Sequence, residues 1–487
     1  MYLIFDTETT GLPLDYNAPL EKLDNWPRVV QIAWQLHDVN GKPIEVKNFI
    51  IKPIGFSIPY NAEKIHGIST ERATKQGVDI EFVFEEFDKA LAQTTFTAGH
   101  NIEFDIKVWG AEYLRSKREL LLTKKESIDT KNESTEFCAI PGGKGGKFKW
   151  PTLTELHTKL FNETFGEAHN ASADVEATTR CFLELIRLGV INFQRLKTTA
   201  DVIAEFRKNN PDPVKLLGLN IKPYEPLEKN TEVKTDENIP IEKSGDHSAD
   251  LETISYSHLH NHSQYSVLQS TSEISKMVKK AADYKMPALA LTDSGNMMAA
   301  FEFVKEIFNH NKKAKAQNEW LKEKGEKETE IIIKPIVGCE FNINRNHKDK
   351  TNKDNGYAVV LLAKNEKGYL NLAKMSSIAY IDGFYYVPRI DKEILLQYKS
   401  DIIATTGGAW GEIPSMILNI GEEQAEQSFL WYKEQFGEDF YAELLRHDQP
   451  EEEKVNEVLL KFCEKHNVKY FAANNTFYLN KEDANAH

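Results

Sequence analysis

The chain contains 487 residues and carries 60 Lys and Arg against 74 Asp and Glu, which gives a formal net charge of −14. That length exceeds a single ordinary core and predicts two domains of about 200 residues each. A content of 41% hydrophobic and 28% charged residues excludes wholesale disorder. The acidic charge alone does not exclude action on nucleic acid, because acidic catalytic centres that hold cations can act on it.

Compartment and membrane association are inferred from what the sequence lacks. It has neither an apolar run of about 18 residues nor the pattern of a signal peptide. The four cysteines are widely scattered and fit neither a disulfide framework nor a zinc site. We therefore expect a cytoplasmic protein that makes no use of a membrane.

The first 187 residues alternate between two apolar patterns. Short apolar runs predict strands at 2–5, 29–34, 48–51 and 96–99. Apolar residues at helical spacing predict helices within 81–92, 106–113, 153–160 and 175–188. Strands with flanking helices predict an α/β fold around a mixed sheet.

A change of composition separates this region from a second one. Residues 225–252 contain no aromatic residue and are rich in Asp and Glu, which predicts a flexible acidic linker. Beyond it, apolar runs at 287–293, 331–340 and 358–362 alternate with helical patterns at 274–282 and 299–308, as is typical of an α/β barrel. The predicted organisation is a first domain over 1–195, a connecting segment over 196–253 and a barrel over 254–487.

Two carboxylates mark the end of the first predicted strand. Asp6 and Glu8 are separated by one residue, so in extended backbone both side chains leave on the same face. Two carboxylates in a dry cleft repel each other unless a cation lies between them. The pair by itself favours a solvated strand end, because this spacing is common by chance.

Three further residues change that interpretation. Asp105 is expected in the first turn of a helix, Asp174 at the start of another, and His169 on the loop before it. In this order and context, the five residues resemble the DEDDh family of 3′–5′ exonucleases. The resemblance also rests on the motifs Phe5-Asp6-Thr7-Glu8-Thr9-Thr10-Gly11-Leu12, Ile65-His66-Gly67-Ile68, Gly99-His100-Asn101 and Lys149-Trp150-Pro151.

The resemblance implies a ribonuclease H-like fold and a two-metal phosphodiesterase. Asp6 would bridge two divalent ions, Mg²⁺ or Mn²⁺, Glu8 and Asp174 would complete one site, and Asp105 would support the other through water. His169 would take a proton from the attacking water. The implied substrate contacts are Thr7, Thr10, Leu12, His100, Asn101 and Phe104.

The second region carries a His-x-His pair. His260 and His262 follow a predicted strand and could bind a metal from one face. The surroundings resemble the PHP domain that opens the alpha subunit of bacterial DNA polymerase III. The stretches that carry this resemblance are Ala290-Leu291-Thr292-Asp293, Pro335-Ile336-Val337-Gly338-Cys339-Glu340, Leu362-Ala363-Lys364-Asn365 and Asn474-Asn475-Thr476-Phe477-Tyr478-Leu479.

An active PHP domain implies a trinuclear metal centre, and this sequence departs from its ligand pattern. His260, His262 and Glu340 are kept. Three ligands cannot hold a metal cluster, so we expect an inactive domain whose histidines are hydrogen-bonded remnants. The replaced positions are Gln269, Ser294, Ala358, Gly408, Asn475 and Phe477.

Together the resemblances predict a 3′–5′ proofreading exonuclease at the front of a replicative polymerase alpha subunit. Its expected partners are a single-stranded or frayed DNA 3′ end, polymerase domains further along the parent chain, and replisome subunits such as the sliding clamp. The barrel is expected to be incomplete at its C-terminal end, in a fragment or a truncated product. Two alternatives stay open: a freestanding nuclease for RNA or short oligonucleotides, and a mainly structural interaction module.

Overall fold

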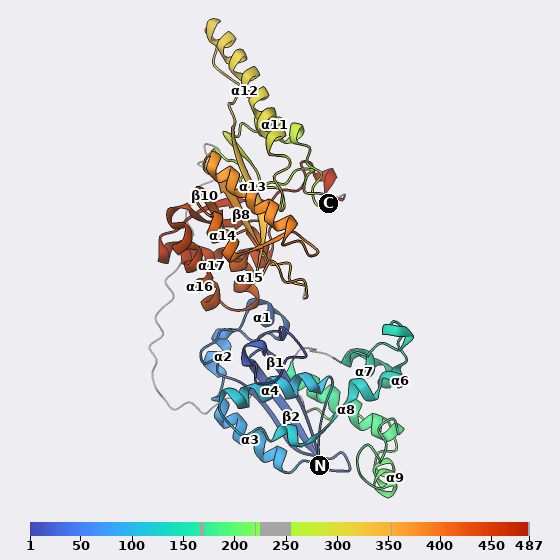
Figure 1. Cartoon of the computed structure of the whole chain (residues 1–487). Helices are drawn as coiled ribbons and strands as arrows, with labels where there is room; N and C mark the ends of the chain where they lie inside the picture. The colour runs from blue at the N-terminus through green and yellow to red at the C-terminus, as the bar shows by residue number, and fades with distance from the viewer. Residues whose placement is uncertain (166–169, 220, 225–254, 352, 486–487) are drawn as a thin grey trace. The chain divides into compact units, whose positions relative to one another are not determined.

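The computed structural model describes residues 1–165, 170–219, 221–224, 255–351 and 353–485, so the predicted linker at 225–252 lies outside the described residues. Two compact units divide the chain. The first covers Met1–Val233 with Asn419–Gly421, and the second covers Lys234–Leu418 and Glu422–His487. Each unit combines a sheet with helices (Figure 1). Within the described residues, no helix combines the length and apolar character needed to cross a membrane.

The first unit is built on a five-stranded mixed sheet in the order β3-β2-β1-β4-β5. β2 runs antiparallel to both β1 and β3, whereas β4 and β5 run parallel to β1. The predicted mixed α/β fold is confirmed. β5 was not predicted, because its four residues include a single apolar one, Ile128. The strands are β1 (Tyr2–Thr9), β2 (Val29–His37), β3 (Pro43–Ile50), β4 (Phe96–Gly99) and β5 (Glu126–Asp129).

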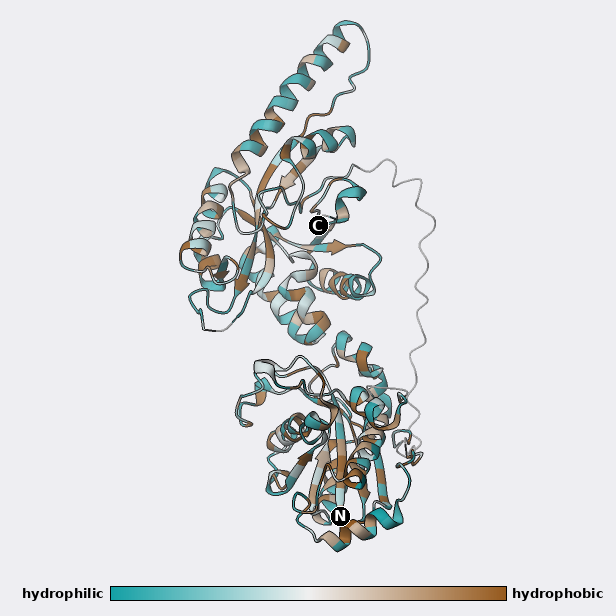
Figure 2. Ribbon diagram, turned by 90° about the vertical axis from the view of Figure 1, so that its right-hand side faces the viewer, coloured by the Kyte–Doolittle hydropathy of each residue, from teal (hydrophilic) through white to brown (hydrophobic). Residues whose placement is uncertain are grey.

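Helices cover both faces of this sheet. They are α1 (Tyr60–His66), α2 (Thr70–Gln76), α3 (Ile80–Ala92), α4 (Ile102–Arg115), α5 (Thr130–Glu133), α6 (Thr135–Cys138), α7 (Leu153–Phe161), α8 (Ala171–Leu188) and α9 (Ala200–Asn209). Residues beyond 195 also pack on this unit, since Ile203, Phe206 and Val214 lie in the same buried cluster as Ile4. Figure 2 shows that the central strands are largely hydrophobic.

The alternation of β1 divides the core into two layers. Leu3 and Phe5 lie in a cluster with residues of α3 and α4, and the Phe5 ring packs edge-on against Phe87 at 5.3 Å. Tyr2 and Ile4 lie in a second cluster with residues of α8. Because successive side chains of a strand point to opposite faces, even-numbered residues of β1 turn toward α8 and odd-numbered ones toward α4.

The second unit contains a seven-stranded sheet in the order β12-β11-β10-β8-β7-β6, with β9 paired to β7. Its strands are β6 (Ala288–Leu291), β7 (Lys334–Asn344), β8 (Tyr357–Ala363), β9 (Arg389–Asp391), β10 (Ile402–Thr405), β11 (Phe440–Leu445) and β12 (Lys469–Ala473). Its helices are α11 (Ile274–Asp283), α12 (Ala300–Glu323), α13 (Glu366–Ile381), α14 (Lys392–Tyr398), α15 (Glu412–Asn419), α16 (Glu422–Phe436) and α17 (Pro450–His466).

The segment around His260 joins the two ends of this sheet. On one side the Thr292 N–H, just after β6, donates to the carbonyl of Asn261 at 2.9 Å. On the other side the Thr476 N–H, just after β12, donates to the carbonyl of His260 at 3.1 Å. The sheet is therefore curled, in agreement with the barrel-like α/β fold expected for this region.

The predicted strand over 331–340 begins later than expected, at Lys334. The backbone of Ile331 and Ile333 is bonded by side chains of α12. The His310 ring lies 3.0 Å from the Ile331 carbonyl, and the Asn311 amide both donates to Ile333 at 2.8 Å and accepts from it at 2.9 Å. Contacts with the preceding helix thus replace a strand ladder at these apolar residues.

Candidate active site

The structure brings three of the predicted carboxylates together at one edge of the five-stranded sheet. Asp6 and Glu8 lie near the end of β1, on the face turned toward α8. Asp174 lies in the first turn of α8, whose N-terminus is capped by the Asn170 side chain accepting from the Ser172 N–H at 3.1 Å. One oxygen from each of Asp6, Glu8 and Asp174 lies within 4.8 Å of the other two.

Asp105 reaches the same edge from the opposite layer. It lies in the first turn of α4 and is buried. Both the N–H and the hydroxyl of Thr7 donate to Asp105 Oδ1, at 3.0 and 2.7 Å. Thr7, predicted as a nucleotide contact, therefore holds the fourth carboxylate in place.

The electrostatics of this cluster favour a bound cation. Burial, followed by repulsion from Asp105, Asp174 and Glu8, raises the pKa of Asp6 well above its usual range. Burial, followed by repulsion from Asp174 and Asp105, raises the pKa of Glu8 to about 8. Burial raises the pKa of Asp105 to about 7, although the Thr7 hydrogen bonds oppose the rise. Divalent cations would relieve this repulsion, and an all-oxygen donor set suits Mg²⁺ or Mn²⁺.

The predicted general base, His169, lies outside the described residues. Three of the predicted substrate contacts, Thr10, Leu12 and Phe104, differ in the solvent exposure of their side chains. Leu12 is 72% exposed and is available to a ligand. The Thr10 hydroxyl accepts from the Arg28 N–H at 2.9 Å, and Phe104 packs against the core cluster of β1 and α4. Of these three, Leu12 alone has a largely exposed side chain.

His100 and Asn101 lie at the end of β4 and make contacts that hold neighbouring loops in place. The two ring nitrogens of His100 lie 3.0 Å from the Thr130 hydroxyl and 3.0 Å from the Pro151 carbonyl. Asn101 has the left-handed backbone conformation, with φ of 69°, at the start of α4. These contacts shape the rim of the site through the backbone.

One basic residue of this rim was missed by the sequence analysis. Lys131 donates to the Asn101 side-chain oxygen at 2.5 Å, and its amine lies 4.7 Å from the centre of the Trp150 ring. Trp150 is 63% exposed. A lysine over an exposed ring beside the carboxylates could meet a nucleic-acid phosphate, and no sequence motif marks it.

In the second unit, His260 lies between two carboxylates. Its Nε2 lies 3.0 Å from Glu340 Oε2, and its Nδ1 lies 2.6 Å from Glu443 Oε1. Burial lowers the pKa of His260, but the two carboxylates outweigh it and raise the pKa to about 10. Burial raises the pKa of Glu340, but the hydrogen bond with His260 and the nearby His262 ring, 3.5 Å away, bring it well below its usual range. The result is a buried Glu–His–Glu ion pair.

Glu443 was not among the predicted residues. The available signal was a single charged residue inside the apolar strand Phe440–Leu445, where a buried acid requires a partner. The identity of that partner depends on sheet order, because His260 precedes Glu443 by 183 positions.

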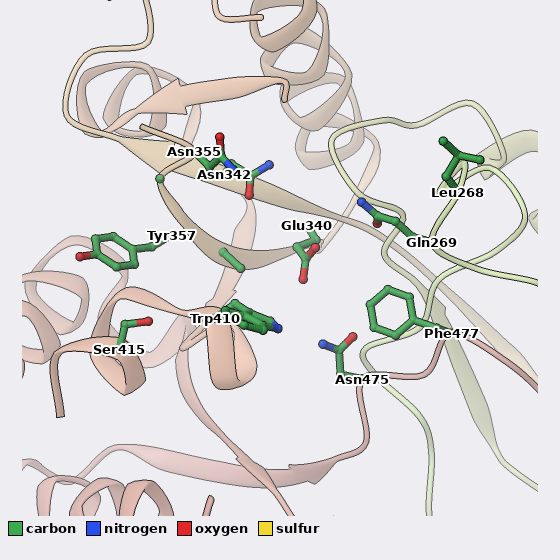
Figure 3. A pocket seen from close by; sticks show the side chains of 12 residues that line it. Leu268, Gln269, Glu340, Asn342, Asn355, Tyr357, Trp410, Ser415, Asn475 and Phe477 are labelled. Atoms are coloured by element: carbon green, nitrogen blue, oxygen red, sulfur yellow. The ribbon is translucent and has the colours of Figure 1, made fainter. Parts of the chain in front are cut away.

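The replaced positions of the predicted metal centre converge in space (Figure 3). Gln269, Ala358, Asn475 and Phe477 line one cavity together with Glu340. Phe477 stacks on the His262 ring at 4.2 Å. A side chain at Gly408 would place its Cβ 3.8 Å from the His260 ring. The Ser294 hydroxyl lies 2.7 Å from Gln269 Oε1 and 3.2 Å from Glu340 Oε1.

This arrangement does not fit a trinuclear metal centre. Among the described residues, His260, His262 and Glu340 form the one other cluster with metal-ligand spacing. Both ring nitrogens of His260 already lie within hydrogen-bond distance of carboxylates. The remaining positions offer neutral oxygens, an aromatic ring or no side chain, and a metal cluster needs charged or imidazole donors.

Comparisons with known proteins divide the chain in the same way. Residues 3–182 match the family model described as exonuclease, and residues 258–447 match the family model described as PHP domain. The chain combines an exonuclease domain with a PHP domain.

Among curated proteins, the chain is similar to the DNA polymerase III subunit alpha of Borreliella burgdorferi, with 41% identity over 233 residues. It is 37% identical over 254 residues to the protein of the same name from Chlamydia trachomatis. These matches cover 47% of this chain but 18% and 19% of the two relatives, so the chain spans about a fifth of their length.

Among solved structures, one described as 3′-end specific recognition of histone mRNA stem-loop by 3′-exonuclease is 15% identical, with a TM-score of 0.31. It covers 39% of this chain and 82% of that chain.

Proposed function

We propose that the exonuclease domain is a metal-dependent 3′–5′ exonuclease that removes 3′-terminal nucleotides from DNA. The observation that supports this most is the carboxylate cluster of Asp6, Glu8 and Asp174, with Asp105 held beside it by Thr7. Such a cluster is costly for a fold unless cations occupy it. The match of residues 3–182 to the exonuclease family supports the same reaction class.

Asp6, Glu8 and Asp174 would hold the divalent cations, with Asp105 supporting them. When bound, two such ions stabilise the attacking and leaving oxygens of a phosphodiester. The backbone that carries Asp6 and Glu8 is fixed because β1 is paired with a strand on each side. Asp105 is fixed because it accepts two hydrogen bonds from Thr7. The protein therefore provides a rigid, preorganised set of oxygen donors.

Other residues would bind the strand and move the proton. His169, five residues before Asp174, would take the proton from the attacking water, because its ordinary pKa lies near neutral pH. The exposed Leu12 would pack against the terminal base, and Lys131 would pair with a backbone phosphate. The polarity of digestion follows if the 3′ end alone fits beside the carboxylates.

The relatives named DNA polymerase III subunit alpha support a place in DNA replication. We propose that the chain is the N-terminal part of such a subunit, that it proofreads 3′ ends, and that its PHP domain is an inactive scaffold. Polymerase domains in the parent chain and the sliding clamp would be its partners, in the cytoplasm. The Glu–His–Glu ion pair supports the inactive scaffold, because it occupies ligands that an active centre would require.

The deciding experiment follows digestion of 5′-labelled single-stranded DNA, with RNA of the same sequence as the second substrate. We expect a ladder of products shortened from the 3′ end with Mg²⁺ or Mn²⁺ and none with EDTA. The Asp6→Asn chain should have no residual nuclease or phosphoesterase activity, since the PHP domain would contribute none. Faster digestion of RNA would favour the alternative substrate, and activity that survives Asp6→Asn would overturn the inactive PHP domain.

A further inference from the structure

The second unit contains a cavity of about 520 Å³ over the buried ion pair. Its volume lies within the usual range of about 300–1,000 Å³ for small-molecule sites. Figure 3 shows its side chains arriving from separate parts of the unit, with Tyr357 and Trp410 on one side of Glu340 and Gln269 and Phe477 on the other. Ala358, one of the replaced ligand positions, contributes only a methyl group to the lining.

The charges of the described residues in the lining disfavour a phosphate group inside the cavity. Glu340 is the one ionisable acid of the lining, and no lysine, arginine or histidine belongs to it. The charge of Glu340 is only partly offset by His260, 3.0 Å away, because His260 also pairs with Glu443 at 2.6 Å. A phosphate placed here would find a carboxylate and no cation, so the cavity selects against dianions. The ligand is expected to be neutral.

The remaining side chains suit a flat ring with hydrogen-bonding edges. Asn342, Asn355, Asn475 and Gln269 contribute carboxamides, which can pair with the adjacent donor and acceptor of a base. The side-chain oxygen of Asn475 is buried without a hydrogen-bond partner among the described residues. This oxygen has almost no accessible surface, so it does not by itself select a ligand in the cavity.

Aromatic rings supply the stacking surface. Trp410 lines the cavity and is 75% exposed, an unusual state for so large an apolar side chain. One face of Phe477 is covered by His262, which fixes that ring. We propose that this cavity binds a neutral nucleobase, stacked on Trp410 and hydrogen bonded to the carboxamides, from a free nucleoside or from an unpaired base of a strand. This inference does not depend on the exonuclease activity.

The test uses the whole chain carrying Asp6→Asn, in EDTA, so that digestion does not interfere. Calorimetric titration with adenosine, guanosine, cytidine and thymidine should detect at least one nucleoside that binds with a dissociation constant below about 1 mM. Trp410→Ala should weaken that binding by roughly 5- to 150-fold, the usual contribution of one base–aromatic stack. Trp410→Phe, which keeps a stacking ring, should restore part of it.

Trp320→Ala is the matched control, because Trp320 is a half-exposed tryptophan on α12 outside the cavity. It should leave nucleoside binding unchanged. Equal binding by the Trp410→Ala chain, or no binding of any nucleoside, would overturn the proposal. A Trp410-dependent preference for nucleoside monophosphates would also overturn it, because the lining should reject phosphate.

A single-stranded oligonucleotide with phosphorothioate linkages distinguishes the two sources of the base. If the strand binds more tightly than the nucleosides, and Trp410→Ala removes that advantage, the ligand is an unpaired base of a strand. If the nucleosides bind as well as the strand, the ligand is a free nucleoside. Strand binding that is unaffected by Trp410→Ala arises elsewhere on the chain and contradicts the strand source.

Discussion

Each domain brings together partly or fully buried carboxylates, and the two domains differ in what offsets their negative charge. In the exonuclease domain, Asp6, Glu8 and Asp174 face one another, and their repulsion together with burial raises the pKa of Asp6 and Glu8. In the PHP domain, His260 lies between Glu340 and Glu443 and supplies the positive charge from within the chain. A cluster made only of carboxylates favours a cation from solution, whereas an imidazolium inside the PHP cluster offsets part of its negative charge and reduces that need. The difference in charge supports the proposal that the exonuclease domain holds cations and that the PHP domain is an inactive scaffold.

The largest expected effect comes from removing a metal ligand in the exonuclease domain. Asp6→Asn or Asp174→Asn should lower the rate of DNA hydrolysis by about 10³-fold or more, because the lost charge stabilisation amounts to several kcal/mol. Glu340→Gln is the matched control, a carboxylate of the PHP cluster whose replacement should leave the rate nearly unchanged. Single-turnover digestion of labelled DNA measures both. An equal loss of rate in the Glu340→Gln chain would indicate that the PHP domain takes part in hydrolysis and would contradict the assignment to the exonuclease domain.

The next effect concerns the proposed general base. His169→Ala should slow hydrolysis by about 10²–10⁴-fold at neutral pH, the usual contribution of a positioned base. Stabilisation of the fold by Mg²⁺ should persist, because His169 is not a proposed ligand. A pH–rate profile is the measurement, and the mutant's rate should partly recover at high pH as hydroxide replaces the base. A flat profile would remove His169 from this role.

Breaking the internal ion pair should affect stability and leave nuclease activity alone. His260→Ala would leave Glu340 and Glu443 buried without a cation, which destabilises a fold by about 3–5 kcal/mol. His447→Ala provides the control, because His447 forms a more exposed pair with Glu452 at 2.7 Å, and surface pairs contribute little. Hydrogen exchange of β10 and β11 reports on this domain. Unchanged protection after His260→Ala would show that the ion pair is dispensable.

The smallest expected effect is on stability as a function of pH, because the two domains should lose stability over different pH ranges. Glu8 has a pKa raised from 4.5 to about 8, so the folded state holds a proton that the unfolded state releases, and metal-free stability falls as pH rises between these values. His260 has a pKa raised from 6.5 to about 10, so its stabilisation is complete below pH 6.5 and is lost as pH rises through 10.

Melting curves recorded against pH in EDTA should show both declines, at about 2–4 °C per kcal/mol for domains of this size. Mg²⁺ or Glu8→Gln should flatten the lower window and leave the upper one unchanged. If Mg²⁺ changed stability only between pH 6.5 and 10, the metal would act on the His260 cluster, which would contradict the proposed metal site at Glu8.

The sequence determined the elements and the local geometry of the carboxylates. The apolar runs predicted β1, β2 and β4, and the helical spacing predicted α3, α7 and α8 within a few residues, because these periodicities report directly on which face is buried. The placement of Asp6 and Glu8 on one face followed from the two-residue period of a strand. The roles of His169, Leu12 and the other proposed contacts remain predictions.

The tertiary structure decided what meets across long separations in the chain. The bond between Thr7 and Asp105 joins residues 98 positions apart, and that between His260 and Glu443 joins residues 183 apart. No local pattern contains this information, because a strand's neighbours depend on sheet order and not on its own residues. The same holds for the cavity beside Trp410, which exists only because separate segments close around it.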